Sequence, residues 1–252
     1  MFFKKDKLTV NIYATGKEMA AQAASDVSTR IGLLLKEKEF VNMIFAAAPS
    51  QTGFLTELIA REEIEWQRIR AFHMDEYIGL EEEAPQRFGN FLKENLFNRV
   101  LFHQVFYLDG LKPAEEECKR YAVLLSEFPA DIVCLGIGEN GHIAFNDPHV
   151  ADFNDPLFVK SVSLDEVCRQ QQVNDKCFAG IQDVPTHALT LTIPTLLLAP
   201  YMYCIVPFRS KAQAVYQALE GEISELCPAS VLRTKENAVL YLDKESASLL
   251  NY

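Results

Sequence analysis

Short apolar runs rich in β-branched residues alternate along the chain with longer stretches of helical spacing. The apolar runs predict strands at residues 8–14, 41–47, 68–74, 105–110, 131–138, 188–193, 203–208 and 238–243. The helical spacing predicts helices at residues 16–37, 53–63, 87–98, 113–127, 210–220 and 244–250. Several strands are apolar throughout, which is typical of strands buried on both faces. The pattern predicts an α/β fold, a doubly wound and mostly parallel sheet with helices on both faces.

No internal repeat or clear linker interrupts this alternation, so we expect residues 1–252 to form a single domain. The polar segment 149–186 breaks the rhythm. It is either a surface flap near a binding site or a plain connection.

The charge of the chain narrows the choice of partners. A net charge of −11 argues against nucleic acid, and no apolar stretch is long enough to span a membrane. The six cysteines form no CxxC pair and the N-terminus lacks a signal peptide, so we expect free thiols in a cytoplasmic protein. The sequence leaves two alternatives for the assembly, a monomer and a homo-oligomer.

Polar residues follow three of the predicted strands. Ser50, Gln51 and Thr52 lie between a buried strand and a helix, where backbone N–H groups suit a phosphate; a simple helix cap is the alternative. Asp75 follows the strand 68–74, where partial burial would tune it as a base, unless it only caps a turn.

The third strand end reads "GIGENGHIAFNDP" (136–148). Gly138 permits a tight exit from the strand that leads to His142. Histidine is the residue type best suited to exchange protons near neutral pH, which fits proton transfer to a sugar oxygen or a carbonyl. Asn140 or Asp147 could fix its tautomer. The alternative is that His142 only satisfies loop carbonyls, and no second histidine at ligand spacing indicates a metal.

Lys211 lies where a strand meets a helix, in "VPFRSKAQAV" (206–215). A cation at the start of a helix opposes the helix dipole, so it either binds an anion or is a solvated helix end.

Together, "MDEYIGL", "GIGENGHIAFNDP", "VPTHALTLTIPTLL" and "SKAQAV" resemble the glucosamine-6-phosphate deaminase (isomerase) family, in order and over nearly the whole chain. The related 6-phosphogluconolactonases share the GHxA core but usually continue toward "SLFP". The resemblance implies a Rossmann-like domain without metal or cofactor. It also implies that an amino-sugar phosphate is isomerised from aldose to ketose, with loss of ammonia.

The resemblance also implies roles for single residues. Asp75 matches the base that moves a proton between C2 and C1, and His142 matches the residue that helps to open the sugar ring. Asn140 and Asp147 match positions that orient this histidine. Lys211 matches a phosphate-binding lysine, and the turn 50–52, with Gly138 nearby, matches the phosphate loop.

Some positions differ from the family pattern. Asp147 stands where many members have Glu, and Asn140 where some have Asp. The phosphate-binding arginine has no clear counterpart, and Lys176 or Arg169 could replace it. Few basic residues occur in 149–160, so we predict no activation by an N-acetyl amino-sugar phosphate.

We therefore expect a deaminating isomerase that acts on glucosamine 6-phosphate or its galactosamine epimer. The alternatives are a 6-phosphogluconolactonase-type hydrolase and a sugar-phosphate sensor without catalysis.

Overall fold

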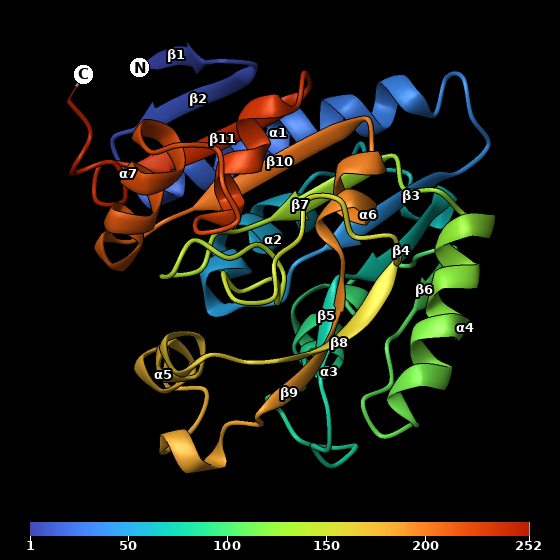
Figure 1. The fold of residues 1–252 in the computed structure, drawn as a ribbon. Coiled ribbons are helices and arrows are strands. Elements are labelled where there is room, and N and C mark those ends of the chain that lie inside the picture. Colours follow the sequence, from blue (N-terminus) through green and yellow to red (C-terminus); the bar gives the residue numbers. More distant parts are fainter. Residues whose placement is uncertain (252) are drawn as a thin grey trace.

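The computed structural model describes residues 1–251, and its framework is an eight-stranded sheet (Figure 1). Its strands are β1 (Phe2–Lys5), β2 (Leu8–Tyr13), β3 (Val41–Phe45), β4 (Ile69–His73), β6 (Gln104–Phe106), β7 (Ile132–Leu135), β10 (Tyr201–Val206) and β11 (Ala238–Asp243). Their order across the sheet is β1-β2-β11-β10-β7-β3-β4-β6. Every neighbouring pair is parallel except β1 with β2, which confirms the predicted sheet.

A second sheet of three antiparallel strands lies below the first in Figure 1. It consists of β5 (Asp75–Tyr77), β9 (His187–Leu191) and β8 (Val159–Ser163), in that order. Only Met74 separates β4 from β5, so the chain passes from the large sheet to the small one within a single residue. The Met74 carbonyl accepts a hydrogen bond from Leu191 N at 2.8 Å. This change of sheet places Asp75 beyond the carboxyl end of β4.

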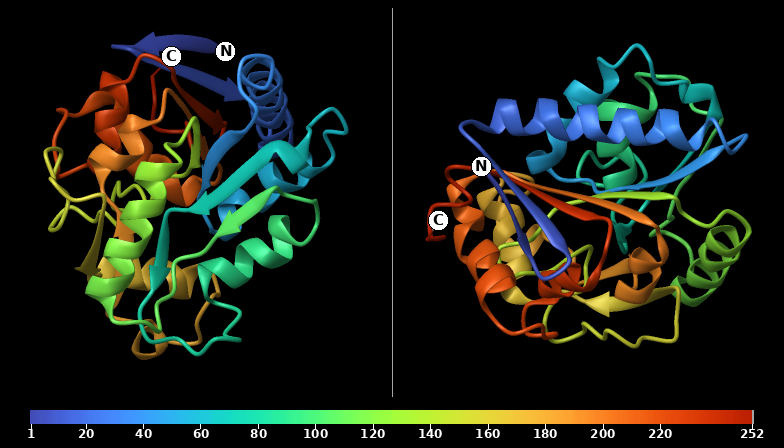
Figure 2. Two further views of the ribbon diagram at one scale, coloured as in Figure 1. Left: turned by 90° about the vertical axis from the view of Figure 1, so that its right-hand side faces the viewer. Right: turned by 90° about the horizontal axis from the view of Figure 1, so that it is seen from above.

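Helices cover both faces of the large sheet, because alternate residues of each buried strand point to opposite sides. Met43 and Phe45 pack with α1 (Gly16–Leu34), α2 (Thr52–Ile59) and α3 (Phe88–Leu92). Ile44 belongs to the opposite core, with α4 (Ala114–Glu127), α6 (Ile193–Leu198) and α7 (Ala212–Glu220). Figure 2 shows α1 on one side of the sheet and α4 and α7 on the other.

Three expectations about elements need correction. The helix expected at 244–250 is wrong, since residues 244–249 form turns. Asp243 and Ser246 exchange side-chain hydrogen bonds with each other's backbone N–H, and such local bonds compete with a helix. The helix expected at 87–98 is split between α3 and a π-helical turn at Lys93–Phe97. The segment 149–186 contains β8 and α5 (Glu166–Asn174), so it is more than a plain connection.

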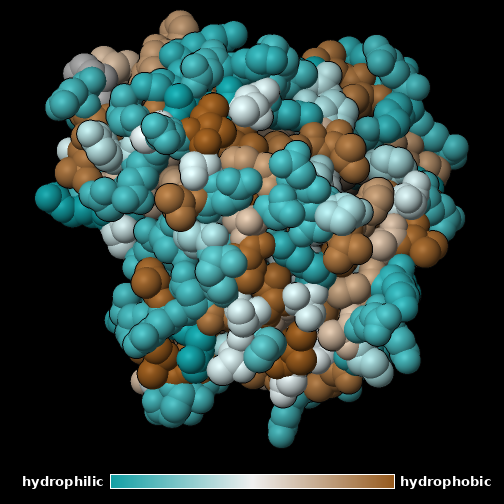
Figure 3. All heavy atoms as spheres, viewed as in Figure 1, coloured by the Kyte–Doolittle hydropathy of each residue, from teal (hydrophilic) through white to brown (hydrophobic). Residues whose placement is uncertain are grey.

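Hydrophilic side chains cover much of the face shown in Figure 3, where apolar ones occur in scattered groups. Within residues 1–251, no helix has the length and apolar character that crossing a membrane requires.

Candidate active site

The order in which strands are added to the large sheet changes direction between the neighbouring strands β3 and β7. After β3 it adds β4 and β6 on one side, and after β7 it adds β10 and β11 on the other. Open parallel sheets bind ligands beyond the carboxyl ends of their strands at such a switch point. The residues that follow these two strands line one cavity here.

Strand ends from both sheets and the helices α3 and α5 contribute to this cavity. The lining residues include Ala46–Ala48, Ser50, Gln51, Met74, Asp75, Phe88, Gly136–Gly138, His142, Ala144, Phe145, Gln171, Gln172 and Lys211. Polar residues that follow three of the strands thus meet in one cavity. The candidate base Asp75, the histidine His142 and the lysine Lys211 all line this cavity.

Gly138 and Gly141 shape the turn that carries His142. Gly138 N donates to the carbonyl of His142 at 2.9 Å, and Gly141 adopts a φ of 86°, which favours glycine. A Cβ built on Gly138 would lie 2.2 Å from Cε1 and Nε2 of His142. The imidazole therefore packs directly on the backbone of Gly138, and no larger residue fits there.

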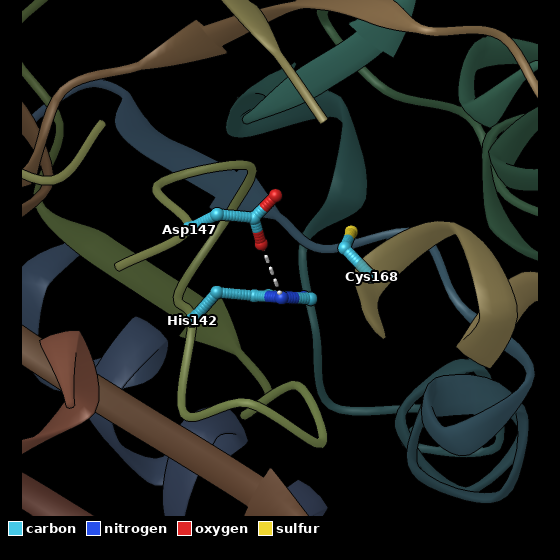
Figure 4. A group of neighbouring side chains, drawn as sticks. All are labelled: His142, Asp147 and Cys168. Carbon is cyan, nitrogen blue, oxygen red and sulfur yellow. Dashed lines mark ion pairs between the residues drawn. The ribbon is translucent and has the colours of Figure 1, made fainter. Parts of the chain in front are cut away.

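Asp147 holds the ring of His142 from one side (Figure 4). Its Oδ1 lies 3.0 Å from Nδ1 of His142 and also accepts a hydrogen bond from Asn140 Nδ2 at 3.0 Å. Burial by itself would raise the pKa of the Asp147 carboxyl, but the hydrogen bonds from His142 and Asn140 outweigh it and lower this pKa. Asp147 thus stays ionised, and Nε2 is the ring nitrogen left for a substrate.

Asp75 is 6% exposed and lines the same cavity as His142. Among the described residues, none forms a hydrogen bond with its Oδ1. Burial, together with the nearby charge of Glu76, raises the pKa of the Asp75 carboxyl. A carboxylate of raised pKa that is free of protein partners is suited to take a proton from a substrate.

The backbone around Asp75 is held by two buried side chains. Nδ1 of His73 donates to the carbonyl of Asp75 at 2.9 Å, while its Nε2 accepts from Leu108 N at 2.9 Å. Burial lowers the pKa of His73 to about 4, so this ring stays neutral and bridges the two segments. Glu76, which is fully buried, accepts hydrogen bonds from the backbone N–H groups of Tyr77, Phe88 and Gly89.

The lysine predicted to bind an anion is directed into the cavity. Lys211 is 3% exposed, and burial lowers the pKa of its ammonium group. Within residues 1–251 it is the only lysine or arginine that lines the cavity. Ser50 and Gln51 border the same space, and Gln51 Nε2 donates to the carbonyl of Ile205 at 3.0 Å. These groups could hold an anionic end of a ligand.

Three residues considered for phosphate binding lie elsewhere. Thr52 is exposed at the start of α2 and does not line the cavity. Lys176 is exposed and borders a neighbouring cavity. Arg169 donates from Nη2 to the carbonyls of Ile181 and Val184 and does not line the cavity either. The structure does not bring these three side chains to the other candidates.

Gln171 and Gln172 were not expected in the site, yet both line it from α5. Glu139 N donates to Oε1 of Gln171 at 2.8 Å, which joins α5 to the turn of His142. The sequence signal that could have indicated them is the polar run "RQQQ" within 149–186. Amide side chains that are buried need hydrogen-bond partners, and a polar cavity supplies such partners.

His142, Asp147 and Cys168 are the one buried group of possible metal ligands in the described part of the chain, with ligand atoms within 4.8 Å of one another (Figure 4). Asp147 already bonds to His142 and Asn140. A metal held here would have to break the pair that orients His142.

Residues 14–241 match the family of glucosamine-6-phosphate isomerases/6-phosphogluconolactonase. The chain belongs to this family. It is 37% identical over 217 residues to glucosamine-6-phosphate deaminase of Bacillus cereus (strain B4264), covering 86% of this chain and 80% of that protein. The protein of the same name from Bacillus thuringiensis (strain Al Hakam) is 36% identical over the same length. The resemblance of the four sequence motifs to this family is confirmed.

Solved structures of the family share the fold. A monomeric glucosamine-6-phosphate deaminase matches with a TM-score of 0.86 and 32% identity, covering 96% of this chain and 99% of that one. The 6-phosphogluconolactonase of Thermotoga maritima matches with a TM-score of 0.77 at 22% identity, covering 94% of this chain and 100% of that one. The Rossmann-like α/β architecture is thus common to both branches.

Proposed function

We propose that this protein is a deaminating isomerase that converts a hexosamine 6-phosphate and water into the ketose 6-phosphate and ammonia. The observation that carries the proposal is the pairing of an unpartnered carboxylate, Asp75, with an oriented imidazole, His142, in one cavity. The relatives named as deaminases, at 32–37% identity, support the same reaction.

The two groups suit two successive proton transfers. His142 transfers a proton from the C1 hydroxyl to the ring oxygen of the cyclic sugar, the bond between C1 and the ring oxygen breaks, and the open-chain aldehyde results. Asp75 then takes the proton from C2 and returns it to C1, through an enolamine. Water adds to the resulting ketimine at C2, and ammonia leaves. General acid–base groups typically contribute ~10²–10⁴-fold each.

The remaining cavity residues would hold the substrate. The phosphate would lie against Lys211, Ser50 and Gln51, at the start of a helix. Asn140 and Asp147 would keep His142 in place throughout, and Gly138 leaves room for its ring. One domain would supply every group that the reaction needs.

The test is an ammonia-release assay with glucosamine 6-phosphate and galactosamine 6-phosphate. We expect turnover of at least one epimer by the wild type. Asp75→Asn should lower kcat at least ~10²-fold while a non-reactive analogue, such as the reduced alcohol of the substrate, still binds by calorimetry. Normal turnover in this variant would contradict the role given to Asp75.

A parallel assay with 6-phosphogluconolactone distinguishes the other branch of the family. Lactone hydrolysis without ammonia release would replace the proposed reaction with the hydrolase. Binding of hexosamine phosphates without any turnover would indicate a sensor instead.

A further inference from the structure

Asp165 precedes α5 and does not line the cavity, yet its carboxylate reaches the turn that carries His142. Its Oδ1 accepts a hydrogen bond from Cys168 N at 2.6 Å and so caps the helix. Its Oδ2 accepts a second hydrogen bond from Asn140 Nδ2 at 2.9 Å. A single carboxylate therefore joins the start of α5 to the catalytic turn.

The side chain of Asn140 uses both of its N–H groups and its amide oxygen in this arrangement. Its Oδ1 accepts from His142 N at 3.1 Å, and its Nδ2 donates to both Asp147 and Asp165. Ionised carboxylates only accept, so the amide can have only one orientation here. Without Asp165, one N–H of Asn140 would lose its acceptor. Nδ2 would then keep only one of its two hydrogen bonds, the one to Asp147.

The position of His142 depends on this amide through Asp147. Asp147 is completely buried, and its Oδ1 is shared between Asn140 Nδ2 and Nδ1 of His142. Its Oδ2 accepts from the backbone N–H of Asp165 at 3.1 Å. Residue 165 thus contacts Asp147 directly through its backbone and indirectly through Asn140.

We propose that Asp165 is a positioning residue of the reaction. It fixes the amide of Asn140, and this amide together with Asp147 fixes the imidazole of His142. The same connection joins the proton-transfer group to α5, the helix that supplies Gln171 and Gln172 to the cavity. The kinetic part of this inference rests on the function proposed above.

The first test is Asp165→Asn, since asparagine is also a favoured N-cap residue and can keep the helix capped. Its amide would place a donor opposite the donor of Asn140. We expect kcat to fall about 10- to 100-fold, with KM within about threefold of the wild type. Thr15→Ala is the matched control, because Thr15 caps α1 through the same contact, with Glu18 N at 3.1 Å, far from these residues in the sequence. It should lower the melting temperature and leave kcat unchanged.

The second test is compensation. Asn140→Asp would bring three carboxylates together, at the atoms that are now 2.9–3.0 Å from Asn140 Nδ2. Adding Asp165→Asn restores a hydrogen bond between positions 140 and 165. The donor is now the amide at position 165, and the acceptor is the carboxylate at position 140. The double variant should therefore turn over faster than Asn140→Asp alone, although Asp165→Asn alone slows the enzyme. A double variant no faster than Asn140→Asp would overturn the proposal.

The third readout needs no substrate and so does not depend on the proposed function. In the wild type, the proton on Nδ1 of His142, which lies 3.0 Å from Asp147 Oδ1, should give a downfield signal in the NMR spectrum. This signal should shift or broaden in Asp165→Asn and remain unchanged in Thr15→Ala. An unshifted signal in Asp165→Asn would overturn the proposal, whatever the kinetics. If the wild type releases no ammonia, the proposed function fails, and this comparison still decides the role of Asp165.

Discussion

Single atoms decide how the imidazole of His142 is placed, and Gly138 is the clearest case. We expect Gly138→Ala to displace the ring, because its new Cβ would lie 2.2 Å from two ring atoms. A displacement of about 1 Å can lower a rate ~10²-fold, so kcat should fall by about this factor. The matched control is Gly32→Ala in α1, where a Cβ meets nothing within 4 Å. That variant should keep full activity, and equal activity in both variants would contradict the placement of the ring.

Glu76 allows a prediction about pH and stability. Burial raises the pKa of its carboxyl to about 7, whereas the ordinary value is near 4.5. The native state therefore binds more protons at this site than the unfolded state between about pH 4.5 and 7, so the site's contribution to stability falls as pH rises through this range. The full difference is on the order of 3 kcal/mol.

Glu76→Gln removes this titration while keeping the side-chain size. The free energy of unfolding of the variant, relative to the wild type, should therefore rise between about pH 4.5 and 7 and level off above it. Urea unfolding at several pH values measures this difference. A difference that does not vary with pH would show that Glu76 titrates normally.

At the level of residues, sequence reasoning identified the groups that carry a recognisable local pattern. Asp75, His142 and Lys211 lie in the segments that follow strands, so their place at the sheet edge could be predicted. Gln171 could not, because it reaches the cavity from a helix far along the chain. Lys176 was considered for the cavity on charge alone, which says nothing about where a side chain points.

At the level of elements, α5 is the part that the periodicity did not reveal. The helix has polar residues on most of its surface, so it lacks the apolar stripe from which helices are predicted. The small sheet was likewise missed, because two of its three strands were not predicted. β5 has only three residues and follows β4 after Met74, and β8 lies in the polar segment 149–186. The large parallel sheet was predictable because its strands are buried and apolar throughout.

Arg169 anchors α5 to the segment that precedes β9, through the carbonyls of Ile181 and Val184. We expect Arg169→Ala to speed hydrogen exchange across residues 166–184 and to raise KM several-fold, because α5 lines the cavity. The value of kcat should fall less than in Asp165→Asn, since the hydrogen bonds of Arg169 are to the carbonyls of Ile181 and Val184 and not to Asn140 or Asp147. Gln170→Ala is the control on the same helix, where the exposed Gln170 contacts Asn174. Unchanged exchange in Arg169→Ala would contradict the anchoring role.

At the level of the whole molecule, the net charge of −11 opposes the approach of a phosphorylated substrate. Salt screens this long-range repulsion, because the Debye length falls from about 30 Å at 0.01 M to about 8 Å at 0.15 M. The contact with the buried Lys211 is screened less.

We therefore expect kcat/KM to rise as ionic strength increases over this range, when substrate concentration is kept below KM. Repeating the series with chloride and acetate salts would separate screening from the binding of a particular ion. A fall in kcat/KM with added salt would show that the local field of the cavity outweighs the charge of the whole molecule.

The division of the site between two sheets has a consequence for how such proteins can diverge. His142 and Lys211 follow strands of the large sheet, whereas Asp75 belongs to the small one. Mutations that reshape the small sheet can therefore move or remove Asp75, the proposed base, while His142 and Lys211 keep their places. A protein that evolved from this chain could therefore catalyse a different reaction on a sugar phosphate while its large sheet stays unchanged. Conversely, mutations around Lys211 could change the group proposed to bind the phosphate while Asp75 is kept.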